Sequence, residues 1–173
     1  MIFKFEHQNN AWATHQPVLY KMCSAPHLHI LEFGCGHNST RLLSLLAENH
    51  GHKVECFESN LEWIQQCKQY ETDRLKINLV EDWTTFFKQQ PFKNRHYDII
   101  FVDQSPWEAR HLTIDNLYNQ TNYLILHDAD HFPNHNFFQF ADYFRYFKLF
   151  LPNPPYPYVT GPPTLLASNY FSC

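Results

Sequence analysis

The segment Leu31–Thr40 (LEFGCGHNST) constrains the fold of this 173-residue chain more than any other part of the sequence. A strand-like apolar run, His27–Phe33, leads into the two glycines, and the polar residues Asn38–Thr40 after them are of the kind that begins a helix. A strand, a glycine turn and a helix together expose free backbone N–H groups and the positive end of a helix dipole. The segment therefore predicts the start of a βαβ unit with a site for a nucleotide-like ligand.

Apolar runs alternate with helical patterns along the rest of the chain, which is typical of a parallel sheet built from βαβ units. We expect seven strands, at residues 27–33, 53–57, 77–80, 97–102, 123–126, 147–151 and 164–170. We expect helices at residues 15–23, 38–46, 60–70, 83–88, 107–118 and 136–144. The predicted fold is a doubly wound α/β sheet, mostly parallel, whose last two strands form an antiparallel hairpin at one edge.

The length suits one domain over residues 1–173, in which residues 1–26 cover the carboxyl edge of the sheet and residues 152–163 form a proline-rich loop. No apolar run approaches the ~20 residues that span a bilayer, which excludes a membrane protein. A formal net charge of -4 disfavours nucleic acid as a partner. The five cysteines form no C-x-x-C pair, and the first ten residues lack a secretory pattern, so we expect reduced thiols and a cytoplasmic location.

Two acidic residues stand where a nucleotide-like ligand would need them. Glu32, at the end of the first strand, can face a cationic amine, while the N–H groups of the glycine turn can receive a carboxylate. An amino-acid zwitterion satisfies both. Glu58 ends the second strand, about twenty residues beyond the turn, where an acidic residue binds ribose hydroxyls.

On these residues the sequence resembles the class I S-adenosylmethionine-dependent methyltransferases, over residues 27–170. The resemblance implies that Glu32 and the turn hold the methionine part of the donor and that Glu58 holds the ribose. It also implies that Asp82 and Trp83 hold the adenine and that Asp103 lies beside the methyl group. The residues expected to contact the donor are Glu32, Gly34, Cys35, Gly36, Ser39, Thr40, Glu58, Ser59, Asp82, Trp83 and Asp103.

Asp103 and the run His127-Asp128-Ala129-Asp130-His131 follow neighbouring strands, so their side chains should converge at the carboxyl edge of the sheet. The arrangement is similar to that of metal-assisted O-methyltransferases, which bind magnesium through acidic residues after these two strands. The resemblance implies Mg²⁺ held by Asp103 and Asp128, where it would lower the pKa of an acceptor hydroxyl. In the alternative, Asp128 caps the segment that follows it and Asp130 is solvated.

A reaction without metal needs a base. His15, His127 and His131 are candidates because a neutral imidazole takes a proton at neutral pH. The predicted catalytic residues are Asp103, His127, Asp128 and His15. Structural alternatives remain for each: Asp103 can accept N–H groups in the turn after its strand, and a histidine can pack or cap.

Two further features have competing interpretations. Asn153–Tyr156 (NPPY) resembles the signature of amino-group methyltransferases, but it lies in the proline-rich loop rather than after the fourth strand, which indicates coincidence. Arg110 can anchor an acidic substrate or belong to a solvated helix start.

The sequence predicts a methyltransferase that uses S-adenosylmethionine to methylate a hydroxyl of a small molecule or sugar. A subunit that binds the donor without catalysis is one alternative. An NAD-binding oxidoreductase is another, although Ser39 stands where a dinucleotide site has its third glycine. The sequence leaves the oligomeric state open.

Overall fold

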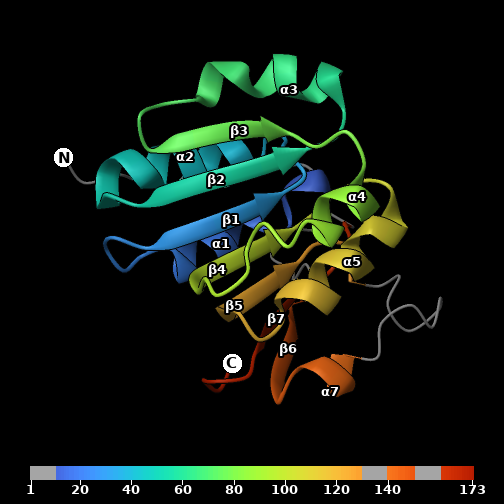
Figure 1. Ribbon diagram of the computed structural model, residues 1–173. Coiled ribbons are helices and arrows are strands. Elements are labelled where there is room, and N and C mark those ends of the chain that lie inside the picture. The colour runs from blue at the N-terminus through green and yellow to red at the C-terminus, as the bar shows by residue number, and fades with distance from the viewer. Residues whose placement is uncertain (1–10, 130–139, 151–160) are drawn as a thin grey trace.

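A seven-stranded β-sheet forms the centre of the computed structural model, which describes residues 11–129, 140–150 and 161–173 (Figure 1). The strands lie in the order β3-β2-β1-β4-β5-β7-β6. Strands β1 to β5 are parallel to one another, and β7 runs antiparallel to both β5 and β6. Their bounds are β1 His29–Phe33, β2 Lys53–Glu58, β3 Leu75–Leu79, β4 Tyr97–Val102, β5 Thr121–Leu126, β6 Tyr146–Phe150 and β7 Thr164–Ser168. The predicted fold class and the C-terminal hairpin are confirmed.

Helices lie on both faces of this sheet (Figure 1). Their bounds are α1 Gln16–Met22, α2 Ser39–His50, α3 Leu61–Cys67, α4 Trp83–Lys88, α5 Trp107–Leu117 and α7 Phe140–Tyr143, with short 3-10 turns at η1 Ala11–Ala13 and η2 Lys68–Tyr70. In the described part of the chain, no helix combines the length and the apolar character needed to cross a membrane.

The sheet separates two apolar layers because successive residues of a strand point to opposite faces. Ile30 of β1 packs in one layer with Leu19 of α1 and with α2. Its neighbour Leu31 packs in the other layer with Phe87 of α4 and Ile114 of α5. This second layer is rich in aromatic side chains, among them Phe33, Phe57, Trp83, Phe87, Phe92 and Tyr97. Both faces are covered, so the free space for a ligand lies at the ends of the strands.

Six of the seven strands begin or end one to two residues away from expectation, and two of these differences have clear local reasons. The third strand covers Leu75–Leu79 rather than residues 77–80. Thr72 Oγ1 accepts the backbone N–H groups of Arg74 and Leu75, which closes a turn at the start of the strand. Leu75 itself is fully buried. The last strand ends at Ser168, because Ser168 Oγ accepts the N–H groups of Tyr170 and Phe171 and turns the chain.

Some predicted features fall outside the described residues. Of the helix expected at 136–144, the structure describes α7 from Phe140 onward. Asp130, His131 and the NPPY tetrapeptide lie outside the described residues, so their predicted roles stay predictions.

Candidate functional site

A cavity of about 480 Å³ lies at the carboxyl ends of β1, β2, β4 and β5. The order of the strands reverses between β1 and β4, and a doubly wound sheet binds its ligand at this point. The volume is in the range of small-molecule sites. The cavity is lined by Trp12, His15, Cys35, Gly36, His37, Asn38, Ser39, Glu58, Asn60, Trp63, Asp103, Ser105, His127 and Asp128.

The two glycines of the first turn have different reasons to be glycine. Gly34 has φ +92°, and a Cβ there would lie 2.6 Å from the backbone of Asp103 and of Gln104. The fold itself therefore requires Gly34, which also bonds to the end of β2 through its N–H to Phe57 O at 2.8 Å. A Cβ on Gly36 would meet only Ser39 Oγ at 3.9 Å. The backbone conformation therefore does not require glycine at position 36. The lack of a side chain at Gly36 instead keeps the cavity open.

Glu58 joins the first two loops of the site. Its Oε2 accepts the N–H of Cys35 at 2.9 Å, and its Oε1 accepts the N–H groups of Ser59 and Asn60 at 2.7 Å. Burial raises the pKa of Glu58, and the three N–H groups oppose that effect. A carboxylate has about four acceptor positions. One position thus remains for a hydroxyl of a ligand.

Glu32 lies beneath the glycine turn. Its side chain is fully buried, and its Oε1 accepts the hydroxyl of Thr40 at 3.1 Å. Thr40 Oγ1 in turn accepts the N–H of Gly36 at 2.9 Å, so Glu32 and Thr40 hold the turn in place from below. Burial raises the pKa of Glu32 to about 7. Glu32 is not among the lining residues, so its predicted contact with an amine stays a prediction.

The two residues expected at the adenine are not among the residues that line the cavity. Asp82 is exposed and caps α4 by accepting the N–H of Thr85 at 2.7 Å. Trp83 is buried beside Phe33, and its Nε1 donates to Ser105 O at 3.0 Å. The tryptophans that do line the cavity are Trp12 and Trp63, the latter in the first turn of α3.

A buried arginine organises the loops after β4 and β5. Arg110 Nη2 donates to Asp103 Oδ1 at 2.9 Å, and its Nη1 donates to Asp128 Oδ2 at 3.2 Å. It also donates to the backbone carbonyls of Gln104 and His127. The cation between the two carboxylates is thus a guanidinium, in the place where the sequence analysis puts Mg²⁺. Arg110 is 5% exposed, which excludes the solvated interpretation of this residue.

Asp103 and Asp128 respond differently to this environment. Burial acts to raise the pKa of Asp103, but the hydrogen bond from His127 and the charges of His127 and Arg110 outweigh it and hold that pKa below its usual value. Burial raises the pKa of Asp128, and the charge of Asp103 adds to the effect. Asp103 is therefore the more firmly ionised of the two carboxyl groups.

His127 is fixed by a hydroxyl from the N-terminal segment. Thr14 Oγ1 donates its hydrogen to Pro162 O at 2.6 Å and lies 3.2 Å from His127 Nε2. Because the Thr14 hydroxyl has a single hydrogen, it acts as acceptor toward the ring, which places a hydrogen on Nε2. His127 Nδ1 then faces Asp103 Oδ1 at 3.2 Å and Asp128 Oδ1 at 3.4 Å.

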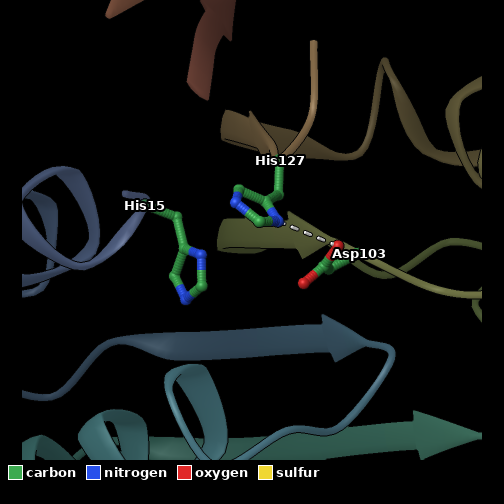
Figure 2. Close-up of side chains that lie close together, drawn as sticks. All are labelled: His15, Asp103 and His127. Atoms are coloured by element: carbon green, nitrogen blue, oxygen red, sulfur yellow. Dashed lines mark hydrogen bonds and ion pairs between the residues drawn. The ribbon is translucent and has the colours of Figure 1, made fainter. Parts of the chain in front are cut away.

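His15 completes this cluster from the end of the N-terminal segment that leads into α1. Its ring lies 4.5 Å from that of His127 between centroids, and both side chains are buried. Figure 2 shows His15, Asp103 and His127 pointing toward one another. Ligand atoms of these three residues lie within 4.8 Å of one another. A carboxylate and two imidazoles in one buried place can transfer a proton or bind a cation.

Comparison with known proteins gives the fold. No family model and no curated protein matches the chain. An rRNA methylase from Streptococcus thermophilus is similar in structure, with a TM-score of 0.60, 12% identity and coverage of 89% of this chain and 95% of that chain. A methyltransferase from Pyrococcus furiosus has a TM-score of 0.56 and 15% identity, over 90% of this chain and 82% of that chain.

A third similar structure was solved with a bound ligand. It is a SAM-dependent methyltransferase from Thiobacillus denitrificans in complex with S-adenosyl-L-homocysteine, with a TM-score of 0.50, 11% identity, and coverage of 86% of this chain and 52% of that chain. The chain has the class I methyltransferase fold.

Within this methyltransferase fold, the predicted site residues divide into two groups. Those that line the cavity are His15, Cys35, Gly36, Ser39, Glu58, Asp103, His127 and Asp128. Those that lie beneath it, beside it or in the core are Glu32, Gly34, Thr40, Ser59, Asp82 and Trp83.

The sequence analysis did not select several residues that line the cavity of this methyltransferase fold, among them Trp12, His37, Asn38, Asn60 and Trp63. The sequence does contain a pattern that indicates the position of Trp63 at the cavity. Asn60 caps α3 by accepting the N–H groups of Glu62 and Trp63, and such a cap directly after the second strand directs the first turn of the helix to the sheet edge.

Proposed function

We propose that the chain is a S-adenosylmethionine-dependent methyltransferase that acts on a hydroxyl of a small molecule or sugar. The observation that carries the proposal is Glu58, whose carboxylate is fixed by three backbone N–H groups and still has an acceptor position in the cavity. A fixed carboxylate at the end of the second strand suits a hydroxyl of a ribose.

The shape of the cavity supports the remaining donor contacts of this proposal. Gly36 lets the methionine part approach the backbone of the turn, where the N-terminus of α2 favours a carboxylate. The exposed ring of Trp63 lies on the Glu58 side of the site and offers a face for the adenine. In this proposal Trp63 takes the part that the resemblance gives to Trp83, while Asp82 acts as a helix cap.

The acceptor hydroxyl would bind beside Asp103 and His127, at the end of the cavity formed by β4 and β5. Transfer is an in-line displacement on the methyl group, so alignment of acceptor oxygen, methyl carbon and sulfonium contributes much of the acceleration. With its hydrogen on Nε2, a neutral His127 has its lone pair on Nδ1 and can take the hydroxyl proton there. Asp103, 3.2 Å away, would stabilise the imidazolium that forms.

The magnesium variant of this proposal has less support. It needs a divalent ion between Asp103 and Asp128, and Arg110 already bonds to both carboxylates. The negative net charge favours a small acceptor over a nucleic acid, although one structural neighbour is an rRNA methylase. The free cysteines agree with a reducing compartment, for which we propose the cytoplasm.

Calorimetric titration with S-adenosylmethionine, S-adenosylhomocysteine and NAD⁺ tests the donor site. We expect the first two to bind and NAD⁺ not to bind. Glu58→Gln should weaken binding by about tenfold or more, since one lost charged hydrogen bond contributes about 1.5–3 kcal/mol. Glu62→Gln, an exposed carboxyl on α3, is the matched control and should bind like the parent. Binding of NAD⁺ alone would overturn the proposal.

A second experiment separates an enzyme from a subunit that only binds the donor. Transfer of a labelled methyl group to a panel of hydroxylated small molecules is measured for the parent and for His127→Gln. We expect transfer to be lost in the variant while S-adenosylhomocysteine binding remains. Donor binding without transfer to any acceptor in the parent would favour the non-catalytic alternative.

A further inference from the structure

We infer that His15, Asp103 and His127 form a binding site for a divalent first-row transition-metal ion such as Zn²⁺ or Co²⁺. The site differs from the magnesium pair in both ligands and ion. It uses two imidazoles, one of them from the N-terminal segment, and a single carboxylate, Asp103, which also accepts a hydrogen bond from Arg110. Binding of the ion does not depend on methyl transfer, because the ion alone is the ligand. An ion on His127 Nδ1 would occupy the lone pair that takes the hydroxyl proton in the metal-free reaction, so the two roles are alternatives.

The first argument is the direction of the His127 ring. Thr14 accepts the hydrogen of Nε2, so a neutral His127 has an unprotonated Nδ1. That nitrogen lies 3.2 Å from Asp103 Oδ1 and 3.4 Å from Asp128 Oδ1. An ionised carboxylate offers no hydrogen, so this contact needs either a proton on Nδ1, as in the hydrogen bond that lowers the pKa of Asp103, or a metal ion. A cation between Nδ1 and the Asp103 carboxylate makes the contact favourable.

The second argument is distance. Zn²⁺ binds imidazole nitrogen and carboxylate oxygen at about 2.0–2.2 Å, so two ligands of one tetrahedral ion lie roughly 3.3 Å apart. His127 Nδ1 and Asp103 Oδ1 already have this spacing, at 3.2 Å. The three ligand atoms lie within 4.8 Å of one another, so His15 has to approach by at most about 1.5 Å to reach ligand spacing. Figure 2 shows the rings and the carboxylate on three sides of one space.

The third argument is charge and donor type. Asp103 and Asp128 oppose a single guanidinium, that of Arg110, so with neutral histidines this group carries one excess negative charge. Two imidazoles and one carboxylate suit Zn²⁺ and its first-row neighbours, whereas Mg²⁺ prefers oxygen ligands throughout. The hydrogen bond from His127 Nε2 to Thr14 is the kind of outer contact that orients a metal-binding histidine.

Three protein ligands leave coordination positions open toward the cavity, which His15, Asp103 and His127 all line. An ion in this site would therefore be accessible to a ligand that enters the cavity, and a hydroxyl bound to it would have a lowered pKa.

Titration of the tag-free, full-length protein with Co²⁺ tests the site, because Co²⁺ bound to imidazole nitrogen absorbs visible light. We expect one Co²⁺ per chain, displaced by Zn²⁺ and not by Mg²⁺. His15→Ala should remove the absorption or weaken binding by about tenfold or more. Thr14→Val, which removes the outer contact to His127 together with the hydrogen bond to Pro162 O, should weaken it by about 10- to 100-fold.

His37→Ala is the matched control, since His37 lines the same cavity but bonds to Tyr70 and Gln66. It should bind Co²⁺ like the parent. Circular dichroism of each variant shows that it is folded. Lack of Co²⁺ binding by the parent, or binding that survives both His15→Ala and Thr14→Val, would overturn the inference. Displacement of Co²⁺ by Mg²⁺ at similar concentration would also overturn it.

Discussion

Gly34→Ala and Gly36→Ala lie two positions apart in one turn and should affect different properties. The first should lower the free energy of unfolding, and the second should weaken binding of the donor. At Gly34, a side chain meets a backbone with φ +92° and places its Cβ 2.6 Å from backbone atoms of Asp103 and Gln104. Such a conformation costs about 1–3 kcal/mol. Overpacking against a backbone that is fixed between β1 and β4 adds about 1–3 kcal/mol. The sum of about 2–6 kcal/mol is a large part of a typical free energy of unfolding.

At Gly36, the same methyl group finds its nearest neighbour, Ser39 Oγ, at 3.9 Å and meets no unfavourable φ. The free energy of unfolding should therefore change by less than about 0.5 kcal/mol. The methyl group does project into the space proposed for the methionine part of the donor. We expect S-adenosylmethionine to bind about tenfold more weakly or worse, from an overlap that costs at least about 1.4 kcal/mol.

Thermal unfolding and calorimetric titration of both variants measure the two effects. Gly34→Ala should lower Tm by about 4 °C or more, since 1 kcal/mol corresponds to about 2–4 °C in a chain of this size. Gly36→Ala should keep the parent Tm and lose donor affinity. Equal losses of stability in the two variants, or parent-like binding by Gly36→Ala, would refute the division of roles between the two glycines.

Three further predictions concern buried or capping side chains. Glu32, whose pKa is raised to about 7 from 4.5, binds its proton more tightly in the folded state, so stability should fall as pH rises from 4.5 to 7, by about 3 kcal/mol. In urea unfolding, Glu32→Gln should remove the fall in the free energy of unfolding between pH 4.5 and 7. A pH profile equal to that of the parent would contradict the prediction. Arg110→Met leaves Asp103 and Asp128 without their shared partner and should cost about 3–5 kcal/mol in the same assay; a cost below about 1 kcal/mol would argue against a structural role. Asn60→Ala removes the cap of α3 and should cost about 1 kcal/mol by thermal unfolding, whereas a Tm equal to that of the parent would show that the cap is not needed.

The sequence by itself determined the order of the elements. Period-2 and helical patterns are local properties, so the seven strands and the helices between them could be read from short segments. The glycine turn after β1 and the acidic residue at the end of β2 were predictable for the same reason. Glu58 lies in the cavity, as its place directly after an apolar strand indicated.

Only the tertiary structure decided which side chains meet. Thr14 and His127 are 113 residues apart, and their contact depends on how the N-terminal segment crosses the sheet edge. The position of Arg110 between two carboxylates depends on how α5 packs beneath the loops after β4 and β5. Trp63 and Trp83 both follow sheet strands in the sequence, yet one lines the cavity and the other fills the core. Local patterns predict secondary structure and buried faces, but the convergence of distant loops is set by the strand order and by packing across the whole sheet.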